Sequence, residues 1–287
     1  MCGAVKMVSL RRQAFEEPAR PCVDGLSFVR SGVENPQKAP FVLIHGAGLR
    51  AEMWSAQLDA LSVDRLVFAV DLPGHGHSVR LASPAPVLAN FTESVAAFIR
   101  EVVGAPSIIV GHAMGATIAL DLAFHAPRLC RGAGALATIF RRTPTAKLQV
   151  SRRAGAMQAR QIDDVSTNPI QCWFGEDRWE SDDAAAAIQC ESWLRSNDGV
   201  GYAAAYSVFA SEDGPSNELL GALNSPTLFL AAQNDENSTP AMAAAMASLA
   251  PAGQAGTIVN ARHMFPMTHS AETSDALRLL AQRVDAF

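Results

Sequence analysis

Residues 108–116 constrain the fold of this chain more than any other stretch, and their sequence is Ile-Ile-Val-Gly-His-Ala-Met-Gly-Ala. A run of β-branched residues ends at Gly111, and a helical pattern begins directly after Ala113. This order predicts a strand, a sharp turn and a helix, the geometry of a nucleophile elbow, in which the turn lifts one side chain off the sheet. Gly111 and Gly115 suit so tight a turn because a Cβ at either position would clash. The elbow pattern has serine at its centre, but this chain has Ala113, whose methyl group cannot attack a carbonyl.

Apolar runs typical of buried strands alternate with helical patterns along most of the chain. Continuous apolar runs such as 41–45 indicate strands that are covered on both faces of a sheet. The alternation predicts an α/β fold with a doubly wound, mostly parallel sheet. We expect strands over 4–10, 24–30, 41–45, 66–70, 108–110, 132–139, 226–232 and 257–259, and helices over 51–61, 87–103, 241–249 and 270–287 besides the elbow helix, which ends near His125.

The alternation stops between residues 141 and 223, where charged residues cluster and aromatic residues gather. We therefore expect a core domain formed by 1–140 and 224–287, and a helical insertion formed by 141–223 over the C-terminal edge of the sheet. Pockets are lined mainly by apolar and aromatic side chains. We expect two or three of the six aromatic residues of the insertion to face a substrate pocket, Trp173 above all; the six are Trp173, Phe174, Trp179, Trp193, Tyr202 and Tyr206.

Composition excludes several classes of partner. The net charge is −5 and there is no long basic run, so we expect no nucleic-acid partner. Apolar stretches are too short to cross a membrane, and the first charges follow a short apolar run, the reverse of a signal peptide. We expect a cytoplasmic protein whose composition is compatible with a homodimer. Its five cysteines show no metal-ligand spacing, so we expect neither a metal nor an organic cofactor.

The residues that could take part in catalysis all follow predicted strands. They are the glycine-rich segment Gly46–Gly48, position 113, the carboxylates Asp235 and Glu236, and His263. In doubly wound sheets, working residues lie on loops at the C-terminal ends of the strands. Gly46–Gly48 is either a plain turn or a loop that points N–H groups at a developing oxyanion. His75 and His77 lie in a polar loop without a carboxylate at metal spacing, which favours a structural role.

Five segments between Val23 and the C-terminus together resemble the motifs of a known family. The chain resembles the α/β-hydrolases, which have an HGxG oxyanion loop, a D-x-P-G-x-G-x-S loop, a G-H-S-M-G elbow, an acid loop ahead of a proline and a catalytic-histidine segment. The matching segments here are 45–48, 71–78, 111–115, 232–240 and 263–266. The resemblance implies an eight-stranded sheet, a helical cap at 141–223, and the chain order elbow, acid, histidine.

The resemblance also implies roles for particular residues. Position 113 would hold the nucleophile, and His263 would act as general base and then as general acid. Asp235 would orient His263, with Glu236 as the alternative because the register of a short motif is uncertain. The backbone N–H groups of Ala47 and Met114 would form the oxyanion hole. The substrate would lie against Gly46, Gly48, Arg50, His112 and Trp173.

Ala113 has two interpretations. One is a deliberate change from serine that keeps a bound substrate intact, and the other is a natural protein that retains the pocket without hydrolysing anything. We favour the first because every other part of the site pattern is retained. Loss of the nucleophile typically costs about a millionfold in rate, so we expect the chain as it stands to be inactive.

Three functions remain open at this point. The first is hydrolysis of a small ester, lactone or amide through an acyl-enzyme. The second is cleavage of a C–C bond in a keto acid, which would need an arginine such as Arg50 for the carboxylate, although a solvated arginine is the commoner case. The third is a ligand-binding protein on the same fold.

Overall fold

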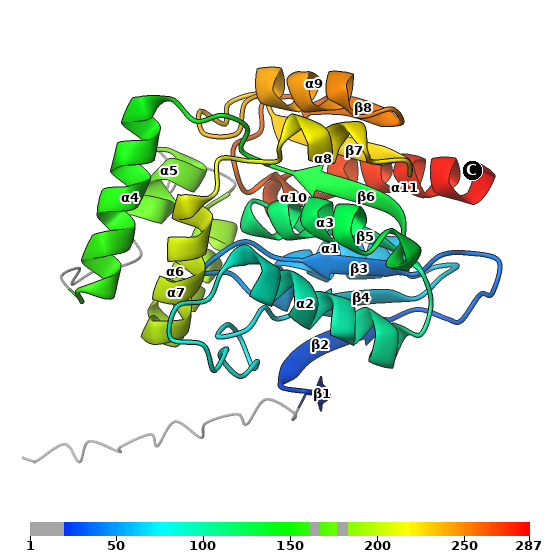
Figure 1. Cartoon of the computed structure of the whole chain (residues 1–287), viewed down its shortest axis with the longest axis horizontal. Coiled ribbons are helices and arrows are strands. Elements are labelled where there is room, and N and C mark those ends of the chain that lie inside the picture. Colours follow the sequence, from blue (N-terminus) through cyan, green and yellow to red (C-terminus); the bar gives the residue numbers. More distant parts are fainter. Residues whose placement is uncertain (1–19, 161–166, 177–182) are drawn as a thin grey trace, which may run out of the picture.

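A computed structural model describes residues 20–160, 167–176 and 183–287, and its centre is an eight-stranded sheet (Figure 1). The strand order is β1-β2-β4-β3-β5-β6-β7-β8. β1 and β2, and β2 and β4, pair antiparallel, and every other neighbouring pair is parallel. The predicted doubly wound, mostly parallel α/β sheet is therefore confirmed. The strands are β1 (Cys22–Val23), β2 (Leu26–Ser31), β3 (Phe41–Ile44), β4 (Val67–Val70), β5 (Ser107–His112), β6 (Cys130–Leu136), β7 (Thr227–Ala232) and β8 (Gly253–Ile258).

Helices cover both faces of this sheet because each central strand is apolar on both sides. In β3, Phe41 and Leu43 face the cluster that includes the apolar side of α11, whereas Val42 and Ile44 face the cluster on the side of α2 and α3. This alternation is the two-residue period of a strand. One face carries α1 (Ser55–Leu61) and α11 (Ser270–Ala286), and the other carries α2 (Leu88–Phe98), α3 (Met114–His125) and α9 (Pro240–Leu249).

Among the described residues between β6 and β7 there are five helices. They are α4 (Pro144–Gln158), α5 (Thr167–Phe174), α6 (Ala184–Ser196), α7 (Gly199–Ser211) and α8 (Asn217–Gly221). Figure 1 shows α4 to α7 gathered at the end of the sheet toward which β3 and β5 run. α8 lies apart from them, against α3 and α9. We use the name insertion helices for α4 to α7.

Several element boundaries differ from expectation; β6, for example, spans Cys130–Leu136 and not 132–139. The strand expected at 4–10 lies outside the described residues, and the edge of the sheet is the two-residue β1. The helix expected over 87–103 ends as α2 at Phe98 and continues as a π-helical turn, η2 (Ile99–Val103), before left-handed Gly104. The helix expected over 51–61 begins with a 3-10 turn, η1 (Ala51–Trp54). The last strand begins at Gly253, four residues before the expected start.

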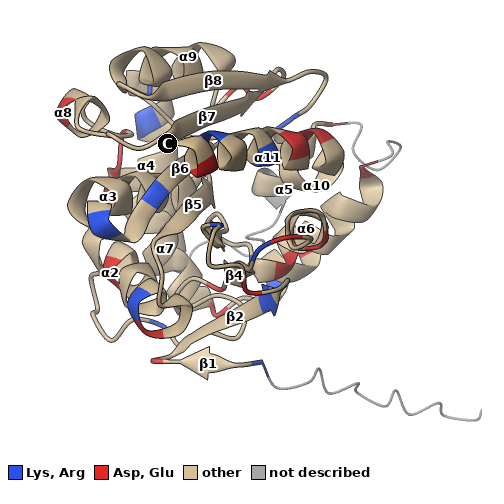
Figure 2. Ribbon diagram, turned by 90° about the vertical axis from the view of Figure 1, so that its right-hand side faces the viewer, with Lys and Arg blue, Asp and Glu red and all other residues tan. Residues whose placement is uncertain are grey.

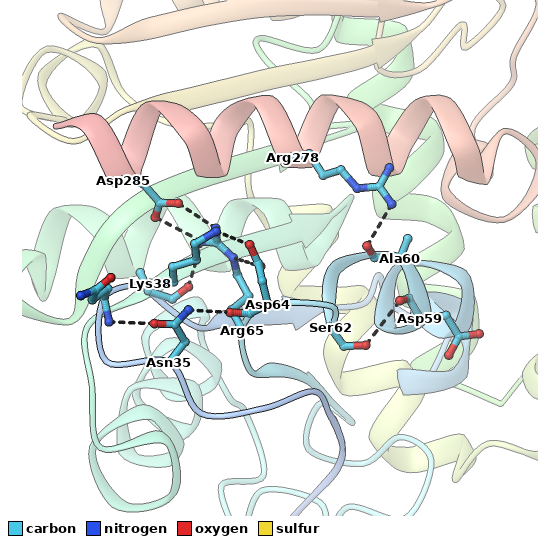
Figure 3. A network of polar contacts seen from close by, with 11 residues as sticks. Asn35, Lys38, Asp59, Ala60, Ser62, Asp64, Arg65, Arg278 and Asp285 are labelled. Atoms are coloured by element: carbon cyan, nitrogen blue, oxygen red, sulfur yellow. Dashed lines mark hydrogen bonds and ion pairs between the residues drawn. The ribbon is translucent and has the colours of Figure 1, made fainter.

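A polar network attaches the C-terminal helix to the start of β4 (Figure 3). Both terminal nitrogens of Arg65 donate to the carboxylate of Asp285 on α11, at 3.2 and 2.7 Å. Its Nε donates to Asp64, which also accepts from Lys38. Arg278, two turns earlier on α11, donates to the carbonyl of Ala60 at 2.9 Å. These contacts attach α11 to α1 and to the segment before β4, while α11 itself packs on β6 and β8.

Charges of both signs are interspersed over the surface helices, as along α6 and α11 (Figure 2). Within the part of the chain that the structure describes, no helix combines the length and apolarity needed to cross a membrane. Two short helices complete the fold, η3 (Pro127–Leu129) after α3 and α10 (Phe265–Thr268) before α11.

Candidate active site

Ala113 stands at the elbow between β5 and α3. Its φ of 51° and ψ of −112° lie where residues with a Cβ are rarely found. Such backbone strain costs about 1–3 kcal/mol and persists where the surrounding structure enforces it. The surroundings do so here, because the Ala113 N–H donates to the carbonyl of Leu136 at 2.9 Å and its carbonyl accepts from Ala116 at 3.0 Å. The fold thus projects the side chain at position 113 off the sheet.

Two glycines allow β5 and α3 to meet so closely. A Cβ on Gly111 would lie 1.9 Å from the carbonyl oxygen of Gly115. A Cβ on Gly115 would lie 2.3 Å from the carbonyl oxygen of Ile44, at the end of β3. Both neighbours are backbone atoms, which cannot swing aside as a side chain can, so these two positions require glycine.

His263 and Asp235 meet although they are 28 residues apart. Nδ1 of His263 lies 2.7 Å from Oδ2 of Asp235, and both side chains are buried. The other carboxylate oxygen of Asp235 accepts from the N–H groups of Asn237 and Ser238, at 2.9 and 3.1 Å. Burial opposes ionisation of Asp235, but the facing imidazole and these N–H groups hold its pKa below the usual value. The structure therefore places Asp235, and not Glu236, behind the His263 ring.

His112 supports His263 from the floor of the site. Its Nε2 donates to the backbone carbonyl of His263 at 3.0 Å, and the two rings are 4.7 Å apart edge to face. Burial, with the nearby His263 ring, lowers the pKa of His112 to about 3. His112 is therefore a neutral donor that fixes the backbone of His263.

The loop after β3 and the start of α3 bring Ala47 and Met114 to one cavity. Met114 is the first residue of α3, and the first N–H groups of a helix have no acceptor within it. In the loop, Gly48 donates to Nε2 of His75 at 2.9 Å and Leu49 donates to the carbonyl of Gly46. Ala47 and Met114 both line the cavity described below. The positive end of the α3 dipole also favours negative charge there.

Two buried histidines hold that loop in place. His75 accepts from Gly48, and Nε2 of His45 accepts from the N–H of Leu72 at 2.9 Å. Burial lowers the pKa of His75 to about 4 and holds the pKa of His45 well below its usual value. His75 thus has the structural position that its sequence context favours, whereas His77 is exposed.

These buried histidines make stability depend on pH. The pKa of His75 is about 4 in the folded chain against an ordinary 6.5, so the unfolded chain binds more protons between these values. Stability is therefore greatest above pH 6.5 and falls as the pH drops toward 4. We expect His75→Gln, which can keep the hydrogen bonds with Gly48 and the carbonyl of Pro73, to reduce the slope of unfolding free energy against pH by about 1 kcal/mol per unit between pH 4.5 and 6.

Urea denaturation at half-unit pH steps measures this slope. His125→Gln controls for the loss of a histidine as such, because the His125 side chain is 63% exposed and lies at the far end of α3. Parallel slopes for the wild-type chain and His75→Gln would show that His75 is not the group that takes up the proton.

A cavity of about 700 Å³ lies over the elbow. Its floor is made by Gly46, Ala47, His112, Ala113, Met114 and His263, and its wall by residues of the insertion helices. Of the six aromatic residues named above, Trp173, Tyr202 and Tyr206 line it. Phe174 and Trp193 are buried in the core, and Trp179 lies outside the described residues. The Trp173 ring stacks on His263, with centroids 6.0 Å apart and planes 23° apart.

Two of the residues expected to bind substrate lie elsewhere. Gly48 does not line the cavity, because its N–H is taken by His75 and its φ of 85° turns the chain beneath Tyr202. Arg50 is also not among the described lining residues, and its guanidinium donates to Oγ of Ser196 at 2.9 Å. Leu49 lies between them and lines the cavity, so the loop presents Ala47 and Leu49 to the cavity and turns Gly48 and Arg50 away from it.

Sequence analysis missed two arginines of the cavity, Arg142 and Arg153. Arg142 is buried, donates to the carbonyls of Phe209 and Glu212, and lies 4.5 Å from the Phe209 ring centroid. Arg153 on α4 lies 5.5 Å from the ring centroid of Tyr206. The signal was present as the paired arginines 141–142 and 152–153, but only the folded structure shows which member of each pair faces the cavity.

Three proteins similar to this chain are named as a hydrolase, an esterase and a lactonase. A hydrolase of Acinetobacter baylyi, (E)-2-((N-methylformamido)methylene)succinate hydrolase, is 33% identical over 85% of this chain and 91% of its own length. A malate-bound thermophilic esterase from Thermogutta terrifontis is 26% identical, with a TM-score of 0.80 over 91% of this chain and 94% of its own. An enol-lactonase from Burkholderia xenovorans shares the fold, with a TM-score of 0.78 over 89% of this chain and 95% of its own at 20% identity.

The family is shown by a match that spans most of the chain. The model of the Alpha/beta hydrolase family matches residues 41–276, from the start of β3 into α11. These residues contain the elbow, the loop after β3 and the Asp235–His263 pair. This chain therefore belongs to the Alpha/beta hydrolase family.

Proposed function

We propose that the cavity binds a small ester, lactone or amide that carries a carboxylate, in a hydrolase site where Ala113 stands in the place of the nucleophilic serine. One observation carries the proposal: His263, paired with Asp235 at 2.7 Å, opens on the same cavity as Ala113 and the amides of Ala47 and Met114. This is the geometry in which a base, a nucleophile position and oxyanion donors serve one carbonyl group.

In this proposal the substrate carbonyl lies over Ala113 with its oxygen toward the two amides. With serine at position 113, His263 would take the hydroxyl proton and Asp235 would stabilise the imidazolium formed. The retained strain at Ala113 supports the assignment, because strained φ and ψ values cluster at functional sites. The chain as it stands would bind substrate without forming an acyl-enzyme.

Arg142 and Arg153 support a carboxylate on the substrate. Guanidinium groups bind carboxylates through charge-assisted hydrogen bonds, and both arginines line the cavity. Two relatives agree in chemistry, since one is named for a succinate derivative and the other holds malate. The same arginines also favour the second candidate function, C–C bond cleavage of a keto acid, which the wild-type site would likewise bind and not turn over.

Binding of matched esters tests this proposal. We expect monomethyl succinate to bind the chain at least about tenfold more tightly than methyl 4-oxopentanoate, which replaces the carboxylate with a neutral methyl ketone. Arg153→Met should abolish the difference, while Arg152→Met, at the exposed neighbour on α4, should preserve it. Isothermal titration calorimetry measures the six affinities, those of two esters for three proteins. Equal binding of the two esters, or equal effects of the two substitutions, would contradict a carboxylate site at Arg153.

A further inference from the structure

Ala113 leaves the Asp235–His263 pair without a hydroxyl to deprotonate. The methyl group at the elbow carries no acidic proton, yet every contact that orients the base is present. The hydrogen bond with Asp235 uses Nδ1 of His263, so Nε2 is the ring nitrogen that can contact a bound molecule. His112 holds the His263 backbone, and Trp173 stacks on the ring. The base is therefore fixed in position and directed at the contents of the cavity.

The site also keeps its means of stabilising an oxyanion. The amides of Ala47 and Met114 line the cavity beside Ala113, at the positive end of α3. Donors placed in this way stabilise negative charge on a carbonyl oxygen whatever the bond change that creates it. An enolate carries the same charge on the same oxygen as a tetrahedral intermediate. A general base beside such donors is sufficient for proton abstraction next to a carbonyl, with no nucleophile involved.

The cavity favours a carbon acid over water as the proton donor. Apolar side chains, among them Trp173, Ala137 and Ile139, make part of its wall, next to the polar residues 236–238. His263 is 7% exposed, so the base meets solvent only through the cavity. The arginines that would bind a carboxylate lie in the same cavity and would hold a keto acid against the floor.

We propose that this chain, with Ala113 in place, abstracts the proton from the carbon beside the ketone of a bound keto acid and returns a proton to that carbon. The C–H electron pair becomes the enolate π bond as the proton passes to Nε2 of His263. The ketone oxygen takes the negative charge and is held by the amides of Ala47 and Met114. The imidazolium exchanges its proton with solvent and re-protonates the carbon, so the net change is hydrogen exchange. This inference rests on the carboxylate binding proposed above.

Exchange in heavy water tests the inference on the unmodified chain. Proton NMR follows loss of the C–H signals beside the ketone in 4-oxopentanoate and 2-oxoglutarate. We expect the wild-type chain to accelerate exchange of at least one of these compounds at least about 100-fold over His263→Gln, the usual range for a general base. Asp235→Asn is a second variant, expected to slow exchange without preventing ligand binding. His125→Gln should exchange at the wild-type rate.

The outcomes separate the two proposals. Keto-acid binding by calorimetry without exchange above that of His263→Gln would overturn proton abstraction and leave the proposed function standing. Absence of both binding and exchange would overturn both. Wild-type hydrolysis of monomethyl succinate without keto-acid exchange would show that the base acts on water, and would also overturn the inference.

Discussion

Ala113→Ser will give this chain esterase activity, raising kcat/KM for p-nitrophenyl acetate at least about 10³-fold above that of the wild-type chain. The elbow would place the new Oγ at the floor of the cavity, where His263 can accept its proton. The amides of Ala47 and Met114 would hold the oxyanion, so acylation lacks only the hydroxyl. Release of p-nitrophenolate, followed by absorbance, measures the change.

The cavity provides a matched control for this gain. Ala137 also lines the cavity and also has a φ of 51°, but it follows β6 and not the elbow. Ala137→Ser adds the same hydroxyl to the same cavity, and we expect no activity from it. The double variant Ala113→Ser with His263→Gln should return to the wild-type rate. A folded Ala113→Ser chain as slow as the wild type, or an equal gain from Ala137→Ser, would refute the assignment of position 113.

Gly115→Ala will destabilise the fold by at least about 3 kcal/mol, because overpacking against backbone leaves no side chain to move aside. The new Cβ would meet the carbonyl oxygens of Ile44 and His45 at 2.3 and 2.6 Å. Relief requires α3 to move away from β3, which would disrupt the elbow. Urea denaturation measures the loss in unfolding free energy.

Gly155→Ala makes the same substitution where a Cβ finds open space. Gly155 lies within α4 and an added Cβ would have no heavy atom within 4 Å. We expect this variant to be more stable than the wild type by about 0.5–1 kcal/mol, because glycine weakens a helix interior relative to alanine. Unfolding free energies of Gly115→Ala and the wild type within 1 kcal/mol of each other would show that α3 and β3 are not locked together as described.

The sequence predicts the strands of the central sheet well where the spacing of apolar residues matches their burial in the structure. The run 41–45 gives a strand whose residues alternate between two helix layers, and Phe41 and Val42 do face opposite clusters. β8 was placed too late because Gly253–Gly256 has little apolar character. Pairing with β7 determines that strand, and a single-sequence pattern contains no information on such pairing.

Some residues of the site can likewise be predicted from the sequence, and others cannot. Asp235 and His263 are predictable because each follows a strand, and parallel strands bring their C-terminal ends to one edge. Arg50 was expected at the cavity because it directly follows the oxyanion loop in sequence, whereas in the structure Leu49 lines the cavity and Arg50 donates to Ser196. Arg153 could not be distinguished from Arg152 by sequence, since only the packing of α4 over the cavity decides which of them faces inward.

The central claim is that the Alpha/beta hydrolase site of this chain is complete except for one oxygen atom at position 113. Intact-protein mass spectrometry after treatment with a fluorophosphonate, which phosphonylates activated serines, measures this directly. We predict one adduct on the Ala113→Ser chain, located at residue 113, and none on the wild-type chain or on the double variant with His263→Gln. An unlabelled Ala113→Ser chain that is folded, or equal labelling with and without His263, would contradict the claim.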